Sequence, residues 1–181
     1  MVDLRRFSLG DLESHPWQVN IPDMAGREWA EFFADVQARG VVEPIRVSLR
    51  TGRPVVVDGH QRTRAAQQFG LTSIQAIVQD FDSEAEEVTY LSGAARFRRN
   101  LTDAQRVTLA RAREAYFKPL AAERKGGRPG AEKPPLNLGE VSEVQQNPHE
   151  RESGAQAAQA VGLKPEKYRQ GKVIQDEAPG R

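Results

Sequence analysis

The hydrophobic positions in the first half of the chain fall largely into short runs with the two-residue period of a strand. Ile45, Val47 and Leu49 are apolar and alternate with polar residues, while neighbouring runs are short and β-branched. The predicted strands are Ile45–Leu49, Pro54–Val57, Ile74–Val78 and, in an otherwise irregular start of the chain, Arg6–Leu9.

Helical periodicity separates these strands. Trp29, Phe32, Phe33 and Val36 form one apolar stripe, which predicts a helix over 27–39. Further helices are predicted at Gly59–Phe69, from Ser83 and from Thr102, where the pairs Ser83/Glu86 and Thr102/Gln105 have capping-box spacing. Pro119 is expected to end or kink the last of these helices. The pattern predicts an α+β fold, with a small mixed sheet and helices, followed by a helical segment.

Composition changes near residue 123. Residues 123–152 are rich in proline and glycine and poor in large apolar residues, which is typical of a flexible linker. Two short helices are expected after it, at Ala155–Val161 and Pro165–Asp176. The predicted organisation is an N-terminal domain at 1–100, a basic helix at 101–122, a linker at 123–152 and a helix pair at 153–181.

Composition excludes several classes of protein. The 181 residues contain no cysteine, which rules out disulfides, thiolate zinc sites and cysteine nucleophiles, and the three histidines show no metal-ligand spacing. A net charge of +1 means that any surface for nucleic acid must be local. The sequence has neither a membrane-length apolar run nor a signal-peptide pattern. A cytoplasmic protein without a membrane partner is therefore expected.

The segment Asp58–Ala66 carries the most chemistry. A buried strand is expected to end there, Gly59 permits a sharp turn, and a helix begins. Free amides and a positive dipole make such a helix start a ready anion site, to which Arg62 and Arg64 add charged donors. The alternative interpretation is an ordinary strand–helix connection with solvated arginines.

The surrounding residues resemble the ParB N-terminal domain. That family has a Gly-hydrophobic-x-x-Pro-Ile approach to a strand, as in Gly40–Ile45 here, and a Gly-Glu-Arg-Arg-x-Arg-Ala box that opens a helix. Gly59–Ala65 matches the glycine, the second and third arginines and the alanine of that box, and departs at His60 and Gln61. The similarity extends over roughly residues 5–120.

The resemblance implies a ParB/sulfiredoxin-type fold, with sulfiredoxin itself excluded because it needs a cysteine. It also implies that the box holds nucleotide phosphates, either of CTP with Mg²⁺, as in partition proteins, or of another nucleoside triphosphate. The residues implied for phosphate or nucleotide binding are Gly59, His60, Gln61, Arg62, Arg64, Arg98 and Arg99. A second family box, Glu-Asn-x-x-Arg, corresponds to Ala94–Arg98, so the carboxylate and amide near the metal are missing and no metal ligand is assigned.

Two further segments predict contact with DNA. Residues 96–118 carry seven basic and two acidic side chains, which favours phosphate contacts over a merely solvated helix face. Residues 155–168 have helix-turn-helix spacing, with Ala158 at the crossing, Gly162 in the turn and Tyr168 buried, although a plain helical hairpin is the alternative. The predicted DNA-binding residues are Arg106, Arg113, Lys164, Lys167, Arg169, Gln170 and Lys172.

Three functions follow. The favoured one is a DNA-binding ParB-like protein, a partition or transcription regulator, that forms a homodimer, carries a nucleotide switch and associates with the nucleoid or a plasmid. The second is a ParB-like nuclease or nucleotide-hydrolysing enzyme, a CTPase for example, in which His60 is the candidate for acid–base chemistry. The third is a degenerate scaffold in which the C-terminal helices alone bind DNA.

Overall fold

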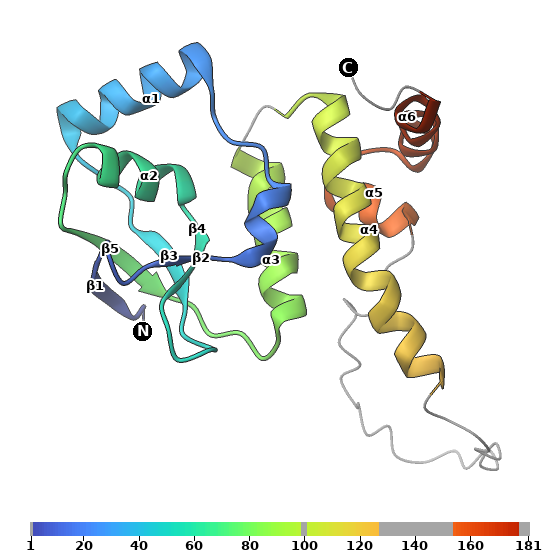
Figure 1. Ribbon diagram of the computed structural model, residues 1–181, viewed down its shortest axis with the longest axis horizontal. Coiled ribbons are helices and arrows are strands. Elements are labelled where there is room, and N and C mark those ends of the chain that lie inside the picture. Colours follow the sequence, from blue (N-terminus) through green and yellow to red (C-terminus); the bar gives the residue numbers. More distant parts are fainter. Residues whose placement is uncertain (1, 99–100, 127–153, 178–181) are drawn as a thin grey trace. The chain divides into compact units, whose positions relative to one another are not determined.

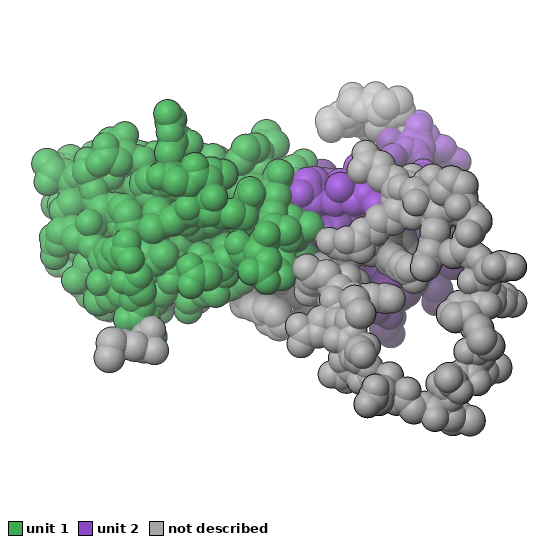
Figure 2. Space-filling model, turned by 90° about the horizontal axis from the view of Figure 1, so that it is seen from below, with its two compact units in different colours: residues 1–100 green, residues 101–181 purple. Residues whose placement is uncertain are grey.

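The computed structural model describes residues 2–98, 101–126 and 154–177, with the backbone alone described for 95–98 and 121–126. The chain divides into two compact units, residues 1–100 and 101–181 (Figure 2). Each unit has buried apolar residues of its own. No helix among the described residues is both long enough and apolar enough to span a membrane.

Unit 1 is built on a mixed five-stranded sheet with the order β1-β5-β3-β4-β2 (Figure 1). The pairs β1/β5 and β3/β4 are antiparallel, whereas β3/β5 and β2/β4 are parallel. The strands are β1 Leu4–Ser8, β2 Glu13–Ser14, β3 Ile45–Ser48, β4 Val55–Asp58 and β5 Ser73–Val78. The helices are the short 3-10 helix η1 Pro16–Asn20, α1 Gly26–Arg39, α2 His60–Gln68 and α3 Glu84–Arg98. The predicted α+β class is confirmed.

The central strands explain the apolar runs of the sequence. Val55, Val56 and Val57 of β4 are all buried, because this strand is covered on both faces. On one face Val56 belongs to a core cluster with Ile45 and with Ala66 of α2. Neighbouring residues of β4 point to the opposite face, where α3 contacts this strand. The end of β4 is therefore held between the two helices.

Most predicted boundaries in unit 1 lie within one or two residues of the observed ones. The exceptions are β2 and η1, which lie in the stretch predicted to be irregular. Both are too short to produce a periodic pattern. η1 depends instead on a local cap, in which Nδ1 of His15 accepts a hydrogen bond of 3.1 Å from the Trp17 amide and Pro16 occupies the first turn.

Unit 2 consists of α4 Asp103–Gly126, α5 Gly154–Ala160 and α6 Pro165–Glu177. α4 begins with the predicted capping box, since the Thr102 amide donates to Gln105 Oε1 at 2.9 Å and the Gln105 amide donates to Thr102 Oγ1 at 3.3 Å. Ala158 and Tyr168 are buried, and Gly162 has a φ of 78° in the turn between α5 and α6, as the sequence predicted.

The sequence predicted that Pro119 would end or kink the helix, and the helix does not end there. α4 runs on through Pro119 to Gly126, so the first part of the predicted linker is helical. The rest of that linker lies outside the described residues. Pro119 has no backbone N–H, so the carbonyl of Ala115 loses its helical hydrogen bond. Both residues are exposed, and water can donate to the freed oxygen.

Gly171 lowers the helix propensity of α6, and the packing of the helix explains why a glycine stands there. A Cβ at this position of α6 would lie 2.5 Å from Cγ2 and 3.2 Å from Cγ1 of Val107 in α4. The two helices therefore approach each other at a point where only a hydrogen fits, and a β-branched valine has little freedom to turn away. The loss of helix propensity is the cost of this close approach.

Replacing Gly171 with alanine should destabilise unit 2, although alanine is the better helix former. The gain in propensity is about 1 kcal/mol, whereas overpacking against Val107 costs roughly 1 to 3 kcal/mol. Denaturant titration of the full chain should show a lower midpoint for Gly171→Ala. Gly93→Ala is the matched control, because nothing lies within 4 Å of the added Cβ in α3, and it should stabilise the protein slightly. A gain in stability for Gly171→Ala would contradict the packing argument.

Candidate functional site

The turn between β4 and α2 requires a glycine. Gly59 caps α2 with φ 95° and ψ 22°, a left-handed conformation that residues with a side chain rarely adopt. A Cβ there would also lie 2.7 Å from Cγ2 of Ile45 in β3. The first intrahelical bond runs from the Thr63 amide to the Gly59 carbonyl, so the three preceding amides of α2 have no acceptor within the helix.

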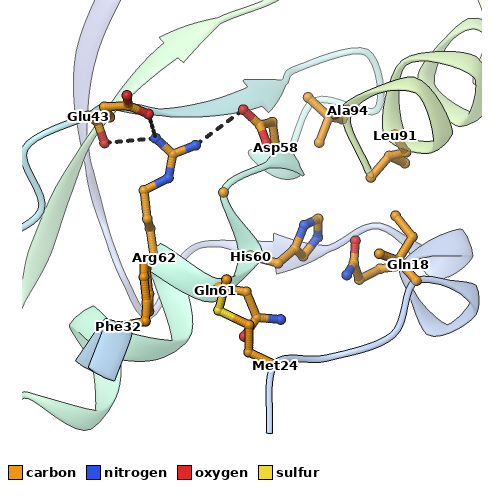
Figure 3. Close-up of a pocket in the computed structure, with 13 residues that line it drawn as sticks. Gln18, Met24, Phe32, Glu43, Asp58, His60, Gln61, Arg62, Leu91 and Ala94 are labelled. Carbon is orange, nitrogen blue, oxygen red and sulfur yellow. Dashed lines mark hydrogen bonds and ion pairs between the residues drawn. The ribbon is translucent and has the colours of Figure 1, made fainter. Parts of the chain in front are cut away.

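A pocket of about 200 Å³ lies beside this turn (Figure 3). Its wall combines the turn itself with segments that are distant in sequence: η1, the chain between η1 and α1, α1, the loop before β3, and α3. Apolar side chains contribute most of the surface; those of Ile21, Met24, Phe32, Val57, Leu91 and Ala94 belong to the lining. The polar lining residues are Gln18, Glu43, Asp58, His60, Gln61 and Arg62.

Three buried side-chain polar atoms in the described part of the chain have no hydrogen-bond partner, and all three belong to residues that line this pocket. They are Oε1 of Gln18, Nε2 of His60 and Oε1 of Gln61. Nε2 of Gln61 donates to Asp23 at 2.7 Å, which leaves its carbonyl oxygen as an acceptor. Buried polar groups are normally paired, so such a cluster is typical of a place that a ligand or ordered water fills.

Arg62 is held in place by four hydrogen bonds. Its Nη1 donates to the carbonyls of Glu43 and Pro44 at 3.3 and 3.1 Å and to the Glu43 carboxylate at 3.0 Å. Its Nη2 donates to the Asp58 carboxylate at 3.2 Å (Figure 3). The side chain is only 13% exposed. This predicted phosphate ligand therefore lines the pocket while it is bound to its own chain.

Arg64, the other predicted arginine of the box, points toward α1. Its guanidinium carbon lies 3.9 Å from the centroid of the Trp29 ring, and Nη1 donates to the Met24 carbonyl at 3.3 Å. Arg64 does not belong to the pocket lining. The structure thus brings Gly59, His60, Gln61 and Arg62 together at the pocket but leaves Arg64 on the α1 side of α2.

Burial in the pocket wall lowers the pKa of His60 from 6.5 to about 4, chiefly because the ring is withdrawn from water. The ring is therefore neutral near pH 7. A neutral imidazole offers one donor and one acceptor, and the low pKa makes it a weak general base. The arrangement favours His60 as a hydrogen-bonding group of the pocket.

The second family box contributes apolar surface to the pocket. Ala94 lines it with a methyl group where the family has a carboxylate. No group of three or more His, Asp or Glu side chains in the described residues is placed to hold a metal ion. The described residues therefore do not fit a magnesium ion held by the protein. The side chain of Arg98 and all of Arg99 lie outside the described residues.

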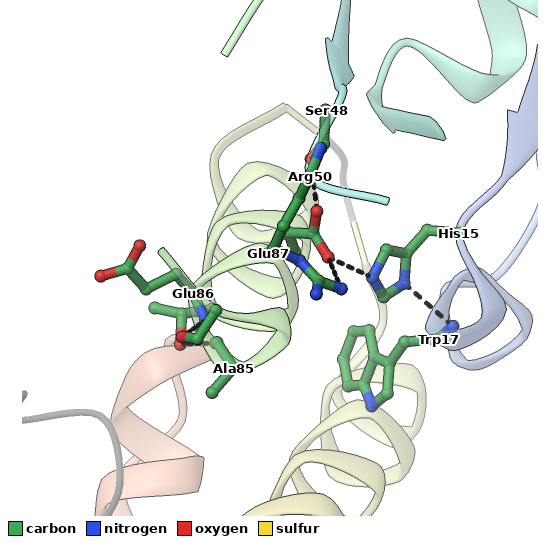
Figure 4. A network of polar contacts seen from close by, with 9 residues as sticks. His15, Trp17, Ser48, Arg50, Ala85, Glu86 and Glu87 are labelled. Atoms are coloured by element: carbon green, nitrogen blue, oxygen red, sulfur yellow. Dashed lines mark hydrogen bonds and ion pairs between the residues drawn. The ribbon is translucent and has the colours of Figure 1, made fainter. Parts of the chain in front are cut away.

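A buried carboxylate holds together α3 and η1, two of the elements that line the pocket (Figure 4). Glu87 of α3 is 2% exposed; it accepts hydrogen bonds from Ser48 at the end of β3 and, at 2.9 Å, from Arg50. His15, just before η1, lies 3.3 Å away through Nε2. Because Nδ1 of His15 accepts from a backbone amide, Nε2 carries the proton and donates to Glu87.

The sequence pattern does not single out this carboxylate. Glu87 stands beside Glu84 and Glu86 in the sequence, but it is buried and bonded. Burial alone would raise its pKa, yet the hydrogen bonds from Arg50 and Ser48 hold the pKa below the ordinary 4.5. Gln18 and Glu43, which line the pocket, were also missed, since no local pattern distinguishes a polar residue that faces a pocket from one that faces water.

The predicted DNA-binding residues of unit 2 divide into two groups. Lys164, Arg169 and Gln170, at the start of α6, are exposed and have no partner among the described residues. Lys167 pairs with Asp103, Lys172 with Glu114 at 3.0 Å, and Arg106 donates to the Leu101 and Gly162 carbonyls. Arg113 is 4% exposed with its guanidinium 5.1 Å from the Phe117 ring, and this burial corrects its placement on a DNA surface.

Comparison with known proteins agrees with this architecture. The sequence matches the model of the ParB N-terminal domain over residues 4–94, and the chain therefore belongs to the ParB N-terminal domain family. No curated protein matches it. A solved Pnob8-like ParB-N domain in a C2221 crystal form is similar, with a TM-score of 0.57 and 15% identity over 70% of this chain and 51% of that one.

Two structures of the C-terminally truncated chromosome-partitioning protein ParB from Caulobacter crescentus are also similar. The complex with CTP-γ-S has a TM-score of 0.44 and 17% identity, over 96% of this chain and 78% of that one. The complex with the centromeric parS site has a TM-score of 0.47 and 18% identity, over 92% and 69%. The likeness to the Pnob8-like domain, at 15% identity, concerns the fold, and the chain spans about half the length of that structure.

Removal of Glu87 should be costly. Glu87→Ala leaves Ser48, Arg50 and His15 without their shared acceptor, and the loss of one partner of a buried charged network costs roughly 2 to 4 kcal/mol. Denaturant titration should show this loss, and Glu84→Ala, at an exposed position one turn earlier, should change stability little. Since the pKa of Glu87 is lowered in the fold, its contribution is present above about pH 4.5 and disappears as the pH falls further. An unchanged midpoint for Glu87→Ala would refute the role assigned to the network.

His60 should make stability depend on pH over a different range. The unfolded chain protonates this histidine below about pH 6.5, whereas the folded protein does so only near pH 4. Stability should therefore decrease as the pH falls from 6.5 to 4, with a slope of at most about 1.4 kcal/mol per pH unit from this group. Thermal unfolding at several pH values should show a flatter dependence for His60→Gln than for the unaltered protein. Identical slopes would mean that the ring is not buried in its neutral form.

Proposed function

We propose that the chain is a DNA-binding ParB-like protein, a partition or transcription regulator, that binds a nucleotide in the pocket at the start of α2. The observation that carries the nucleotide part is the clustering of three unpartnered buried polar atoms in that one pocket. Neutral hydrogen-bonding groups and apolar walls suit a nucleobase or sugar. The unpaired amides at the start of α2 and the guanidinium of Arg62 suit a phosphate.

CTP is the first nucleotide to test, because the box at Gly59–Ala65 resembles that of the partition proteins. The ligand is proposed to enter with its own counter-ions, since the described residues provide no carboxylate cluster for magnesium. Binding without turnover is favoured. With a pKa lowered to about 4, His60 is a weak base, which weakens the hydrolytic alternative.

DNA binding is proposed for α6, as the second helix of a helix-turn-helix. Lys164, just before α6, and Arg169 and Gln170, in its N-terminal half, are exposed where this motif makes its base and phosphate contacts. The resemblance to the family also supports a homodimer, and with it a cytoplasmic protein associated with the nucleoid or a plasmid.

One observation favours the scaffold alternative, in which only the C-terminal helices bind DNA. Both arginines of the box, Arg62 and Arg64, are engaged by the protein itself. A site built for phosphate alone would present them to solvent. Nucleotide titration separates the two proposals.

The experiment is a calorimetric titration of the full chain with CTP, ATP, GTP and UTP, with and without Mg²⁺, in parallel with fluorescence anisotropy on double-stranded DNA. We expect one triphosphate to bind and His60→Ala to weaken it about tenfold, as one lost hydrogen bond implies. Lys164→Ala plus Arg169→Ala should weaken DNA binding and lower its salt dependence by about two charges, whereas Arg27→Ala plus Arg39→Ala on α1 should not.

Each part can fail separately. If none of the four triphosphates binds, with or without Mg²⁺, the nucleotide part is wrong, and the scaffold alternative holds if the chain still binds DNA. If the double substitution on α6 leaves the affinity for DNA and its salt dependence unchanged, α6 is not the DNA-binding helix.

A further inference from the structure

The carboxylates that line the pocket repel a phosphate, the ligand group that the start of α2 favours. Arg62 carries one positive charge and is bonded to two carboxylates, Asp58 and Glu43. All three residues line the pocket, and the neutral ring of His60 adds no charge. Among the charged residues that line the pocket, a phosphate that enters therefore meets two carboxylates and one guanidinium.

The two carboxylates are not equivalent. Asp58 ends β4, and its side chain is 11% exposed, so it is fixed by the sheet. Glu43 lies on the loop between α1 and β3, and its side chain is 74% exposed. An exposed carboxylate can turn into water at little cost, because water replaces the hydrogen bond that it loses.

The guanidinium itself would keep its position after such a movement. Nη1 of Arg62 also donates to the backbone carbonyls of Glu43 and Pro44, and Nη2 remains on Asp58. Only one of the four bonds has to be exchanged. The arginine is therefore preorganised, and the Glu43 carboxylate occupies the place that an incoming anion would take.

We propose that Glu43 is a displaceable counter-ion that sets the affinity of the pocket for phosphate-bearing ligands. The phosphate replaces the Glu43 carboxylate on Nη1 of Arg62, and the carboxylate turns out into solvent. Binding is thereby coupled to the loop before β3, and ligands without an anionic group gain nothing from the exchange. This inference rests on the proposed nucleotide-binding function of the same pocket.

The test compares the unaltered protein with Glu43→Gln by calorimetric titration of CTP and of inorganic pyrophosphate. Glu43→Gln keeps the size of the side chain but removes the competing charge. We expect both ligands to bind about three- to tenfold more tightly, the effect of a single solvent-exposed charge at contact distance. The affinity for cytidine, which has no phosphate, should not change.

Glu31→Gln is the matched control, because it removes the same charge from an exposed pair with Arg27 on α1, away from the pocket lining. It should leave all affinities unchanged. Glu43→Asp, which retains the charge on a shorter side chain, should give no gain, and it separates the charge effect from a general loosening of the loop.

The outcomes distinguish this inference from the function on which it rests. If the unaltered protein binds CTP and Glu43→Gln binds it equally or more weakly, Glu43 is not a competing counter-ion, although the pocket still binds nucleotides. If Glu43→Gln and Glu31→Gln give the same gain, the effect is one of net charge and the inference is wrong. If neither the unaltered protein nor Glu43→Gln binds CTP or pyrophosphate, the proposed nucleotide function fails and the inference fails with it.

Discussion

The carboxylate of Glu87 is the interaction on which the architecture of unit 1 depends. It ties α3 to the end of β3 through Ser48 and Arg50, and to the start of η1 through His15. A charge withdrawn from water is tolerated only when several donors surround it, so these segments must meet in one arrangement or leave the charge unpaired. α3 and η1 are also the elements that bring Leu91 and Gln18 to the pocket. The far wall of the pocket is thus fixed by an interaction outside it.

The near wall is fixed by sterics. The left-handed backbone of Gly59 and its close approach to Ile45 determine where α2 begins, and with it the direction of the free amides. Between these two walls the polar groups are held without being satisfied. The unpaired buried side-chain polar atoms of the described part of unit 1 therefore lie in one place, within a frame of sheet and helices. This distribution is expected of a binding site and not of a general defect in packing.

The sequence was sufficient for what depends on local chemistry and periodicity. Alternation at Ile45–Leu49, the capping box at Thr102 and the glycine at position 59 each act within a few residues, and each prediction held. What could not be predicted depends on contacts between distant residues. Glu87 looks like its solvated neighbours until β3 and η1 surround it, and Gly171 looks like a flaw until Val107 is beside it. The prediction that Arg113 contacts DNA has the same weakness, since helical spacing places the residue on a face of α4 but does not say what covers that face.

The electrostatics of the pocket bear on what its ligand does there. Bond cleavage at phosphorus depends on stabilising charge in the transition state, and a cationic site with a group that can transfer protons assists it. The described residues offer the opposite: a histidine held neutral, an alanine at Ala94 where the family has a carboxylate, and an arginine whose charge is already matched by Asp58 and Glu43. Such a site gains little from stabilising a transition state. The energy of binding is instead available to replace the contact between Arg62 and Glu43 with a contact between Arg62 and the ligand. Such an exchange shifts the population of positions of the loop before β3 toward the position that the ligand prefers. The departures from the family's box, which weaken the case for catalysis, therefore leave the case for a binding-driven switch intact.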